Sequence, residues 1–471
     1  MAVDPYVQKR HWYRSTFYNA TILGICNFLA PGIWGAMNSL GAGGEEKPYL
    51  VNAANALTFC LMVVSCFFGS ALVNIFGIKI VLAFGTAGYA PFAAGLYTNN
   101  RYGTEWLVLF GAACCGICAG VFWMSEAAIA LSYPEPYNQG KFLGYWLSYR
   151  VAGQILGGAV NLGLNVHKSG AGKVSYTVYI IFIVLQALGP FAALLLTPPG
   201  KVQRADGVPV KLYVNTGPKY ELKATAKLFL TKRFLLIVPL IVQAVFPESF
   251  NGTFLTLHFS VRARALGSFL SAIVAITVGN ILGWFLDRNS IALKTRARSA
   301  FVVVLGLQGC WWAWSTYIQS RYQPSGVILD WADAGFGKGF ALYLFLVAGF
   351  QLNYLYLYFV VGHLVSEPED IVRIASLLRG TESASQAVSY GVQSVESFGT
   401  VGGSALNFGL WGVSLLPAWL VIREIGVTLE GRVEREARLA ADRATTKDIV
   451  GVDEERVIES ASQSSEKVAA I

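Results

Sequence analysis

Residues 198–233, PPGKVQRADGVPVKLYVNTGPKYELKATAKLFLTKR, form the longest hydrophilic break in an otherwise apolar chain. The segment opens with prolines and glycines, which are typical of a linker, and from about Lys219 it becomes a basic amphipathic pattern that predicts a helix. Long apolar stretches lie on both sides of it. The segment therefore predicts a link between two apolar halves of the chain.

The composition predicts an integral membrane protein. Of 471 residues, 54% are hydrophobic and only 14% are charged, which is too apolar for a soluble protein of this size. Stretches long enough to cross a bilayer as helices recur on each side of the break. We predict twelve spans, six in each half, at 16–40, 50–75, 79–97, 106–132, 142–166, 174–197, 234–260, 266–286, 299–318, 339–361, 376–400 and 404–422.

The distribution of lysine and arginine predicts the orientation. With the N-terminus inside, and with Lys79 and Arg379 counted at the inner ends of their spans, the cytoplasmic segments before the tail hold 19 basic residues and the outer loops hold 8. Both termini are therefore expected in the cytoplasm, and the first apolar run is expected to act as its own anchor. The basic excess of the membrane body predicts contact with anionic lipid and not with nucleic acid. The sequence leaves open whether the membrane is the plasma membrane or an endomembrane such as that of the vacuole or endosome.

These predictions divide the chain into five regions. They are a cytoplasmic N-terminus at 1–15, a first six-helix half at 16–197, the linker with its amphipathic helix at 198–233, a second half at 234–422 and a charged, partly disordered tail at 423–471. Two pseudo-symmetric halves joined by a long cytoplasmic loop are the layout of the major facilitator fold. The predicted fold class is therefore all-α.

Equivalent inner loops of the two halves carry traces of one signature. In the superfamily, a small residue lets two helices touch and an acid followed by bases stabilises one conformation. The second copy keeps the acid and base, whereas the first has asparagine in place of the acid. The residues concerned are Asn74, Gly77 and Lys79 in the first copy and Gly283, Asp287 and Arg288 in the second.

Both halves also contain a span interrupted by proline. The segment APGIWGAMN lies at 30–38 in the first span, and FPESFNGTF lies at 246–254 in the seventh. Irregular helix at membrane depth is tolerated where it is buried in protein or faces a watery cavity. We therefore expect these segments to face a central cavity, although a purely structural kink is the alternative.

Charged residues inside the spans are the main candidates for function, since each needs a partner, water or a role. Glu126 and Arg150 lie at similar depths and are predicted to form an ion pair, either as a proton or cation site or as a fixed structural pair. Glu248 is the best cavity-facing acid of the second half. Glu382 and Glu396 are 14 residues apart and are expected on one face of the eleventh span, as a proton path or as a water-exposed stripe.

Further polar and aromatic residues could complete the cavity, although for each an ordinary packing or interhelical hydrogen-bond role is the alternative. They are Asn27, Trp34, Asn251, Gln351, Asn353 and Tyr354. Three glycine pairs with small-x-x-x-small spacing predict close helix contacts. They are Gly116 with Gly120, Gly153 with Gly157, and Gly279 with Gly283.

Several longer blocks resemble the fungal branch of the Unc-ninety-three-like family, the ion channel regulatory protein family. They include LAPGIWGAMNSLGAGG at 29–44, WMSEAAIALSYPEPYNQGKFLGYW at 123–146 and RGTESASQAVSYGVQSVESF at 379–398. The resemblance runs from about residue 14 to residue 425. It implies a fold of the major facilitator type, with either a transport function or an accessory role beside a channel or receptor.

Two functions therefore remain. The leading one is an ion-gradient-driven transporter of an unknown small solute, and the alternative is a non-transporting accessory or trafficking subunit of another membrane protein. The sequence contains no G-x-x-x-x-G-K-[ST] loop and no clustered histidine and cysteine ligands. Enzymatic activity, a metal and an organic cofactor are therefore not expected.

Overall fold

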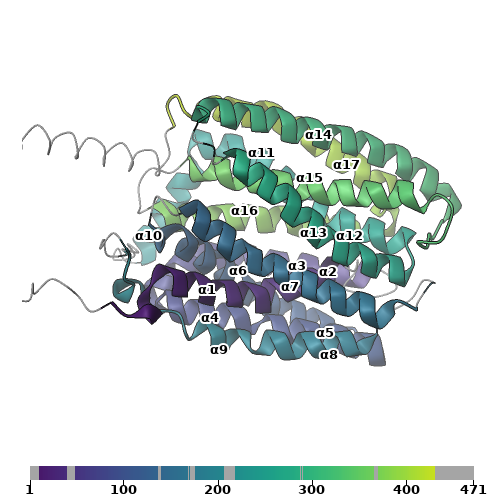
Figure 1. The fold of residues 1–471 in the computed structure, drawn as a ribbon, viewed down its shortest axis with the longest axis horizontal. Coiled ribbons are helices and arrows are strands. Elements are labelled where there is room, and N and C mark those ends of the chain that lie inside the picture. Colours follow the sequence, from purple (N-terminus) through teal and green to yellow (C-terminus); the bar gives the residue numbers. More distant parts are fainter. Residues whose placement is uncertain are drawn as a thin grey trace, which may run out of the picture.

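The chain folds into a bundle of long helices, and no strand occurs in the part that the structure describes (Figure 1). The computed structural model describes residues 10–39, 48–135, 139–167, 169, 175–205, 210, 218–286, 288, 290–364 and 370–429. The predicted tail lies almost entirely outside these residues. The fold class predicted from the sequence is confirmed as an all-α membrane bundle.

The first half contains the helices before residue 198. They are α1 (Thr16–Asn27), the π-helical turn η2 (Phe28–Gly32), α2 (Ile33–Ser39), α3 (Tyr49–Phe76), α4 (Ile78–Ala87), α5 (Tyr89–Tyr102), α6 (Trp106–Ser132), α7 (Gln139–Asn165), α8 (Tyr176–Ala187) and α9 (Gly189–Ala193). Short 3₁₀ turns at Trp12–Arg14 and Pro199–Lys201 flank this half.

The linker and the second half contain the remaining helices. They are α10 (Pro218–Phe229), α11 (Lys232–Val245), α12 (Pro247–His258), α13 (Val261–Leu286), α14 (Leu293–Tyr322), α15 (Phe336–Gly362), α16 (Asp370–Gln393) and α17 (Val401–Ile422), with 3₁₀ turns at Gln323–Ser325 and Glu396–Phe398. Helix α10 begins one residue before the position expected for the amphipathic helix, and it contacts both α3 and α16.

Ten segments within the described residues are long and apolar enough to cross a membrane. They correspond to ten of the twelve predicted spans. The other two predicted spans are α7 and α16, helices of 27 and 24 residues that run beside the ten but are more polar. An integral multi-pass protein is thus established, while the count of twelve stays a prediction.

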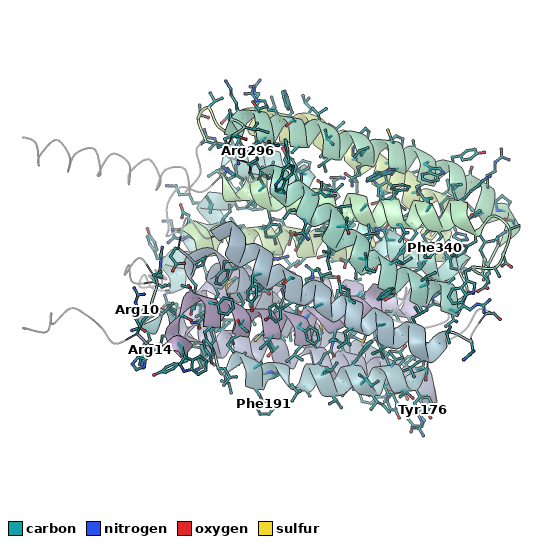
Figure 2. The ribbon with its side chains drawn as sticks, in the orientation of Figure 1. Arg10, Arg14, Tyr176, Phe191, Arg296 and Phe340 are labelled. Atoms are coloured by element: carbon teal, nitrogen blue, oxygen red, sulfur yellow. The ribbon has the colours of Figure 1, made fainter. Side chains whose placement is uncertain are left out.

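The halves lie side by side, with the purple-to-blue first half below the green-to-yellow second half in Figure 1. One buried apolar cluster fills the first half and two fill the second. Arg10 and the end of the described chain at Leu429 lie at the same end of the bundle, here called the terminal end (Figures 1 and 2). The opposite end is called the distal end. Which end faces the cytoplasm stays a prediction.

Two helix pairs form most of the contact between the halves, α3 with α16 and α7 with α13, and α6 also packs against α16. Phe59 of α3 stacks on Tyr390 of α16 at 5.5 Å between ring centroids. Near the distal end, the Asn52 side chain donates hydrogen bonds to the Thr253 hydroxyl at 3.2 Å and to the Gln393 carbonyl at 3.1 Å. The distal ends of the two halves are therefore in direct contact.

The proline-interrupted segment of the first span is a buried helix and not a loop. Pro31 lacks an N–H, and the chain passes it as the π-helical turn Phe28–Gly32 before continuing as α2. Gly32 lies against α7, where an added Cβ would be 3.0 Å from the Arg150 carbonyl oxygen. In the second half the helix is interrupted at Phe246, and Pro247 opens α12.

The glycine pairs behave differently from one another. A Cβ at Gly116 would lie 2.3 Å from the Thr58 carbonyl oxygen, and one at Gly157 would lie 2.2 Å from the Ala36 Cβ, so these pairs do bring helices together. The prediction for the third pair is wrong. A Cβ at Gly279 would only touch Gln351 at 3.6 Å, and Gly283 has no neighbour within 4 Å among the described residues.

The signature residues lie at the terminal end of the bundle. Gly77 has φ of 77° in the short link between α3 and α4, a conformation that favours glycine, and Asn74 and Lys79 flank it half-buried. In the second copy Asp287 lies outside the described residues, and Arg288 is exposed with its guanidinium over Trp284. There it is Arg296 that donates a hydrogen bond to the Leu286 carbonyl at the end of α13.

Candidate functional site

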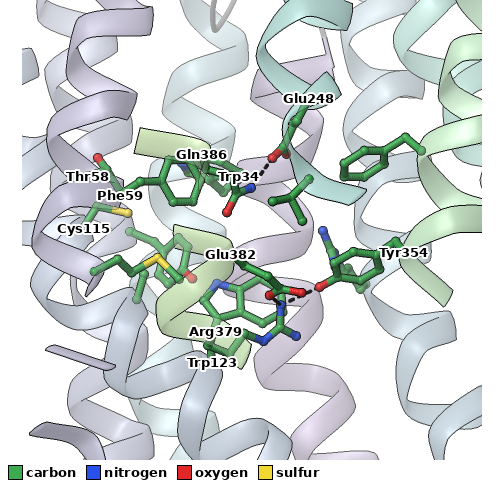
Figure 3. A pocket seen from close by; sticks show the side chains of 16 residues that line it. Trp34, Thr58, Phe59, Cys115, Trp123, Glu248, Tyr354, Arg379, Glu382 and Gln386 are labelled. Atoms are coloured by element: carbon green, nitrogen blue, oxygen red, sulfur yellow. Dashed lines mark hydrogen bonds and ion pairs between the residues drawn. The ribbon is translucent and has the colours of Figure 1, made fainter. Parts of the chain in front are cut away.

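A small cavity lies between the two halves and is shown from close by in Figure 3. It offers about 40 Å³ to the centres of water molecules, which is room for about three waters. The first half contributes Trp34, Thr58, Phe59, Met62, Tyr89, Cys115, Ala119, Trp123 and Arg150, and the second half contributes Val245, Glu248, Phe350, Tyr354, Arg379, Glu382 and Gln386. The lining therefore combines aromatic walls with four charged side chains.

Five residues proposed from the sequence line this cavity. They are Trp34, Arg150, Glu248, Tyr354 and Glu382. Trp34 lies two residues after the π-helical turn and Glu248 directly follows Pro247, so each interrupted segment contributes one side chain to the cavity. The two interrupted helix segments thus occur where polar or aromatic side chains line the cavity inside the membrane-spanning bundle.

Arg379 and Glu382 of α16 form a buried ion pair. An Arg379 Nη1 lies 2.8 Å from Glu382 Oε2 and also donates a hydrogen bond to the Tyr354 hydroxyl of α15 (Figure 3). The guanidinium carbon lies 4.3 Å from the ring centroid of Trp123, which belongs to the first half. This cation–π contact connects the two halves, and the positive charge of Arg379 in it is already neutralised by Glu382.

Arg150 of α7 projects into the same cavity from the other half. Its guanidinium carbon lies 5.0 Å from the Trp123 ring centroid and 5.9 Å from that of Tyr354. Arg150 is half-buried, and within the described part of the chain it forms no ion pair. It is the one charged side chain that the first half contributes to the cavity lining.

The predicted ion pair between Glu126 and Arg150 is wrong. Glu126 is fully buried on α6, and its Oε1 accepts a hydrogen bond from the Trp146 indole of α7 at 2.7 Å. Its other oxygen has no hydrogen-bond partner among the described residues. Depth along the two helices is similar, but the rotation of each helix directs Arg150 toward the cavity and Glu126 toward Trp146.

Glu248 is held in the cavity wall by one neutral partner. Its Oε2 accepts a hydrogen bond from the Gln386 amide of α16, and it forms no ion pair with any described residue (Figure 3). Burial favours the neutral form of a carboxyl group that has no cationic partner. The cavity therefore contains one carboxyl group that is paired with an arginine and one that is not.

The predicted common face of Glu382 and Glu396 is also wrong. Helix α16 begins at Asp370 and ends at Gln393, six residues earlier at its start and seven earlier at its end than the predicted span. Glu396 lies beyond it in a 3₁₀ turn and is exposed. The ladder of acids on one helix face does not exist.

The remaining candidates lie away from the cavity lining. Asn27 and Asn251 are buried within α1 and α12, and Gln351 lies near Gly279 between α13 and α15. Asn353 joins Gln243 and Gln308 in a buried hydrogen-bonded cluster inside the second half. Asn353 thus takes part in hydrogen bonds between α15, α11 and α14, and it is not part of the cavity lining.

The structure adds residues that the sequence did not single out as site candidates, chiefly Arg379, Gln386 and Trp123. Arg379 carried a usable signal, because it lies inside a predicted span three residues before Glu382, a spacing that places opposite charges side by side on a helix. Gln386 and Trp123 carried no such signal. Neutral side chains of these types occur throughout apolar helices.

The sequence profile of the Major Facilitator Superfamily matches residues 13–366. The chain belongs to the Major Facilitator Superfamily. A protein of Aspergillus versicolor named "Notoamide biosynthesis cluster protein O'" is 40% identical over 425 residues, which are 90% of this chain and 92% of that protein. UNC93-like proteins of Schizosaccharomyces pombe and Arabidopsis thaliana are each 26% identical, and cover 80% and 81% of this chain and 76% and 84% of their own lengths. The resemblance noted in the sequence is thereby confirmed.

Solved structures support the same fold. The xylose transporter XylE of E. coli, in a partially occluded inward-open conformation, matches with a TM-score of 0.58 at 13% identity, covering 86% of this chain and 99% of that one. A transporter of the POT family matches with a TM-score of 0.57 at 10% identity, covering 86% and 96%. At these identities the similarity establishes the fold alone.

Proposed function

We propose that the protein is a secondary transporter that moves a small organic solute by alternating access through the central cavity. One observation carries the proposal. A small cavity with four charged side chains in its lining lies between the halves, and a proline-interrupted segment from each half supplies a side chain to it. Paired interrupted helices around a site at mid-depth are the arrangement expected of a transporter.

Protons are the coupling ion that the cavity fits best. Glu248 faces the cavity with Gln386 as its hydrogen-bond donor and no cation paired to it, so it can gain and lose a proton as access changes from one side to the other. A dry cavity favours the neutral form of the Glu248 carboxyl group, and water that enters the cavity stabilises the ionised form. The change in hydration that accompanies alternating access would then drive proton uptake and release.

The names of related proteins agree with a small solute. The relative from Aspergillus versicolor is named for a biosynthesis cluster, and a structural neighbour is described as a proton:xylose symporter. The UNC93-like names favour the alternative of an accessory subunit, as does Asn74 in place of the signature acid. The two functions differ in whether any solute crosses the membrane.

The test is uptake by the purified full chain in proteoliposomes. Vesicles with and without an inward proton gradient would be incubated with a mixture of small metabolites, and the trapped solutes would be identified by mass spectrometry. We expect at least one solute to accumulate only when the gradient is present. Accumulation should be lost in Glu248→Gln and kept in Glu396→Gln, because Glu396 is exposed outside α16.

Two results would contradict the proposal. One is the absence of uptake for every solute together with co-purification of a channel or receptor, which would establish the accessory role. The other is uptake by Glu248→Gln that still follows the proton gradient. Unchanged unfolding temperatures of both variants would show that each variant is folded, so that a difference in uptake does not come from unfolding.

A further inference from the structure

The guanidinium of Arg150 has aromatic neighbours, and no carboxylate of a described residue lies in ion-pair contact with it. Trp123 and Tyr354 lie at 5.0 Å and 5.9 Å from its central carbon. Rings bind the face of a guanidinium, while hydrogen bonds and carboxylates engage the donors along its edge. Within the described part of the chain nothing accepts a hydrogen bond from those donors, and Arg150 is part of the cavity lining.

Arg379 provides an internal comparison, because it touches the same two rings. Its guanidinium carbon lies 4.3 Å from Trp123 and 5.8 Å from Tyr354. Unlike Arg150, it is paired with Glu382 at 2.8 Å and donates to the Tyr354 hydroxyl. The cavity thus contains two guanidinium groups but a single carboxylate in ion-pair contact with either of them.

Glu248 and Glu382 attract Arg150 electrostatically, but neither lies in ion-pair contact with it. The hydrogen-bond donors along the edge of its guanidinium are therefore available to an anionic ligand. The other carboxyl group in the lining, Glu248, is already bonded to Gln386. A carboxylate is the group that matches the planar fork of a guanidinium with two parallel hydrogen bonds. The cavity lining also includes the rings of Trp34, Phe59 and Phe350, which suit a flat apolar body.

We propose that the transported solute is a planar organic anion whose carboxylate binds the edge of Arg150 while its ring packs against the aromatic walls, in a conformation whose cavity is wider than the room for about three waters seen here. This inference rests on the proposed transport function and adds the class of substrate. It also predicts electroneutral transport, because one carboxylate anion of the solute and the one proton carried by Glu248 together move no net charge across the membrane.

Binding to the purified full chain tests the charge requirement. Isothermal titration would compare benzoate, benzamide and benzylamine, which share one ring and carry negative, neutral and positive groups, with inorganic phosphate as an anion that has no ring. We expect saturable binding of benzoate at least about tenfold tighter than that of the other three, since hydrogen bonds to a charged group and the ring contacts act together.

Substitution tests the role of Arg150 itself. Arg150→Gln should weaken benzoate binding at least about tenfold, whereas Arg150→Lys should keep part of it because the charge remains. Arg233→Gln is the matched control, since Arg233 pairs with Glu424 on the exposed surface, away from the cavity lining. Unchanged thermal unfolding of Arg150→Gln would exclude a folding defect.

The outcomes separate this inference from the transport function. Equal binding of benzamide or benzylamine, binding of phosphate alone, undiminished benzoate binding by Arg150→Gln, or no binding of any probe would overturn the anion site. Gradient-driven uptake of a neutral or cationic solute would overturn it too, while leaving the transporter in place. Binding of benzoate without uptake of any solute would instead support the anion site and contradict transport.

Discussion

Trp123 contacts two arginines that have the same charge and different partners. Arg379 is paired with Glu382, whereas among the described residues Arg150 has aromatic contacts and no ion pair. Trp123 belongs to the first half and Arg379 to the second, so the indole is also part of the contact between the halves. A single side chain thereby links the charge balance of the cavity to the packing of the two halves.

Gly116 gives a prediction about helix packing. Alanine at this position would place a Cβ 2.3 Å from the Thr58 backbone oxygen, which cannot move without shifting α3. We expect Gly116→Ala to destabilise the protein by about 1–3 kcal/mol because of overpacking. Gly283→Ala is the control, since nothing within the described residues lies within 4 Å of its Cβ position. Equal unfolding temperatures of the two variants in detergent would contradict the packing assignment.

Trp146 gives a second prediction, because it is the hydrogen-bond donor to the buried Glu126. Trp146→Phe leaves that carboxyl group without a partner among the described residues and should cost about 1–3 kcal/mol. In a Glu126→Leu background the polar group is gone, so the same substitution should cost clearly less. Thermal unfolding of the four proteins measures the difference. Equal costs in both backgrounds would show that the bond does not stabilise the fold.

The sequence was sufficient to single out a site residue where its charge alone marks it. It was not sufficient where the role depends on which way the side chain points. Glu248 and Arg150 were found because ionisable groups inside spans need a reason to be there. Their partners were missed, since the pairing of Glu126 with Arg150 was inferred from depth, and depth leaves the rotation about the helix axis undetermined. Gln386 and Trp123 could not be singled out, because their roles come from neighbours distant in sequence.

At the scale of elements, α16 shows where the apolar pattern misleads. The predicted span began at 376, yet the helix begins at Asp370, and Arg373 within its first turns is buried. Polar residues extend the helix because neighbouring helices cover it, with α10 packed on it near the terminal end. The turn at Glu396–Phe398 ends the span early, and a window that averages hydropathy cannot detect that turn.

The link between α14 and α15 gives a prediction about pH. Asp330 accepts hydrogen bonds from Arg262 and from the Ser260 hydroxyl, and so fixes this link to the start of α13. The Arg262 guanidinium lowers the pKa of the Asp330 carboxyl group well below its usual range. A depressed pKa in the folded state gives stability that is present above the unfolded value of about 4 and is lost as the pH falls further.

Asp330→Asn should therefore lower the unfolding temperature by a similar amount at every pH between about 5 and 9, where the native carboxyl group stays ionised. The difference from the native protein should shrink only below about pH 4. Asp333→Asn is a nearby comparison that leaves the bonds of Asp330 with Arg262 and Ser260 in place. A difference that disappears between pH 5 and pH 9 would contradict the assigned pairing.

At the scale of the whole molecule, the long linker and the apolar spans on each side were sufficient to predict the fold class. The fold is fixed by burial and by chain connectivity, both of which leave a pattern in the sequence. The contacts between the halves were not predictable, because they join residues far apart in the chain, from Gly158 against Phe269 to Asn52 with Gln393. The contacts of Asn52 hold the distal end together.

Locking the distal end tests alternating access most directly. In a variant that combines Asn52→Cys with Thr253→Cys, the two new thiols replace side chains that are 3.2 Å apart at their polar atoms, so oxidation should join the halves. Uptake into proteoliposomes would be measured before and after reduction, with each single variant as control. The account predicts uptake that is abolished by the disulfide and restored by reduction. Undiminished uptake through the oxidised protein would contradict it.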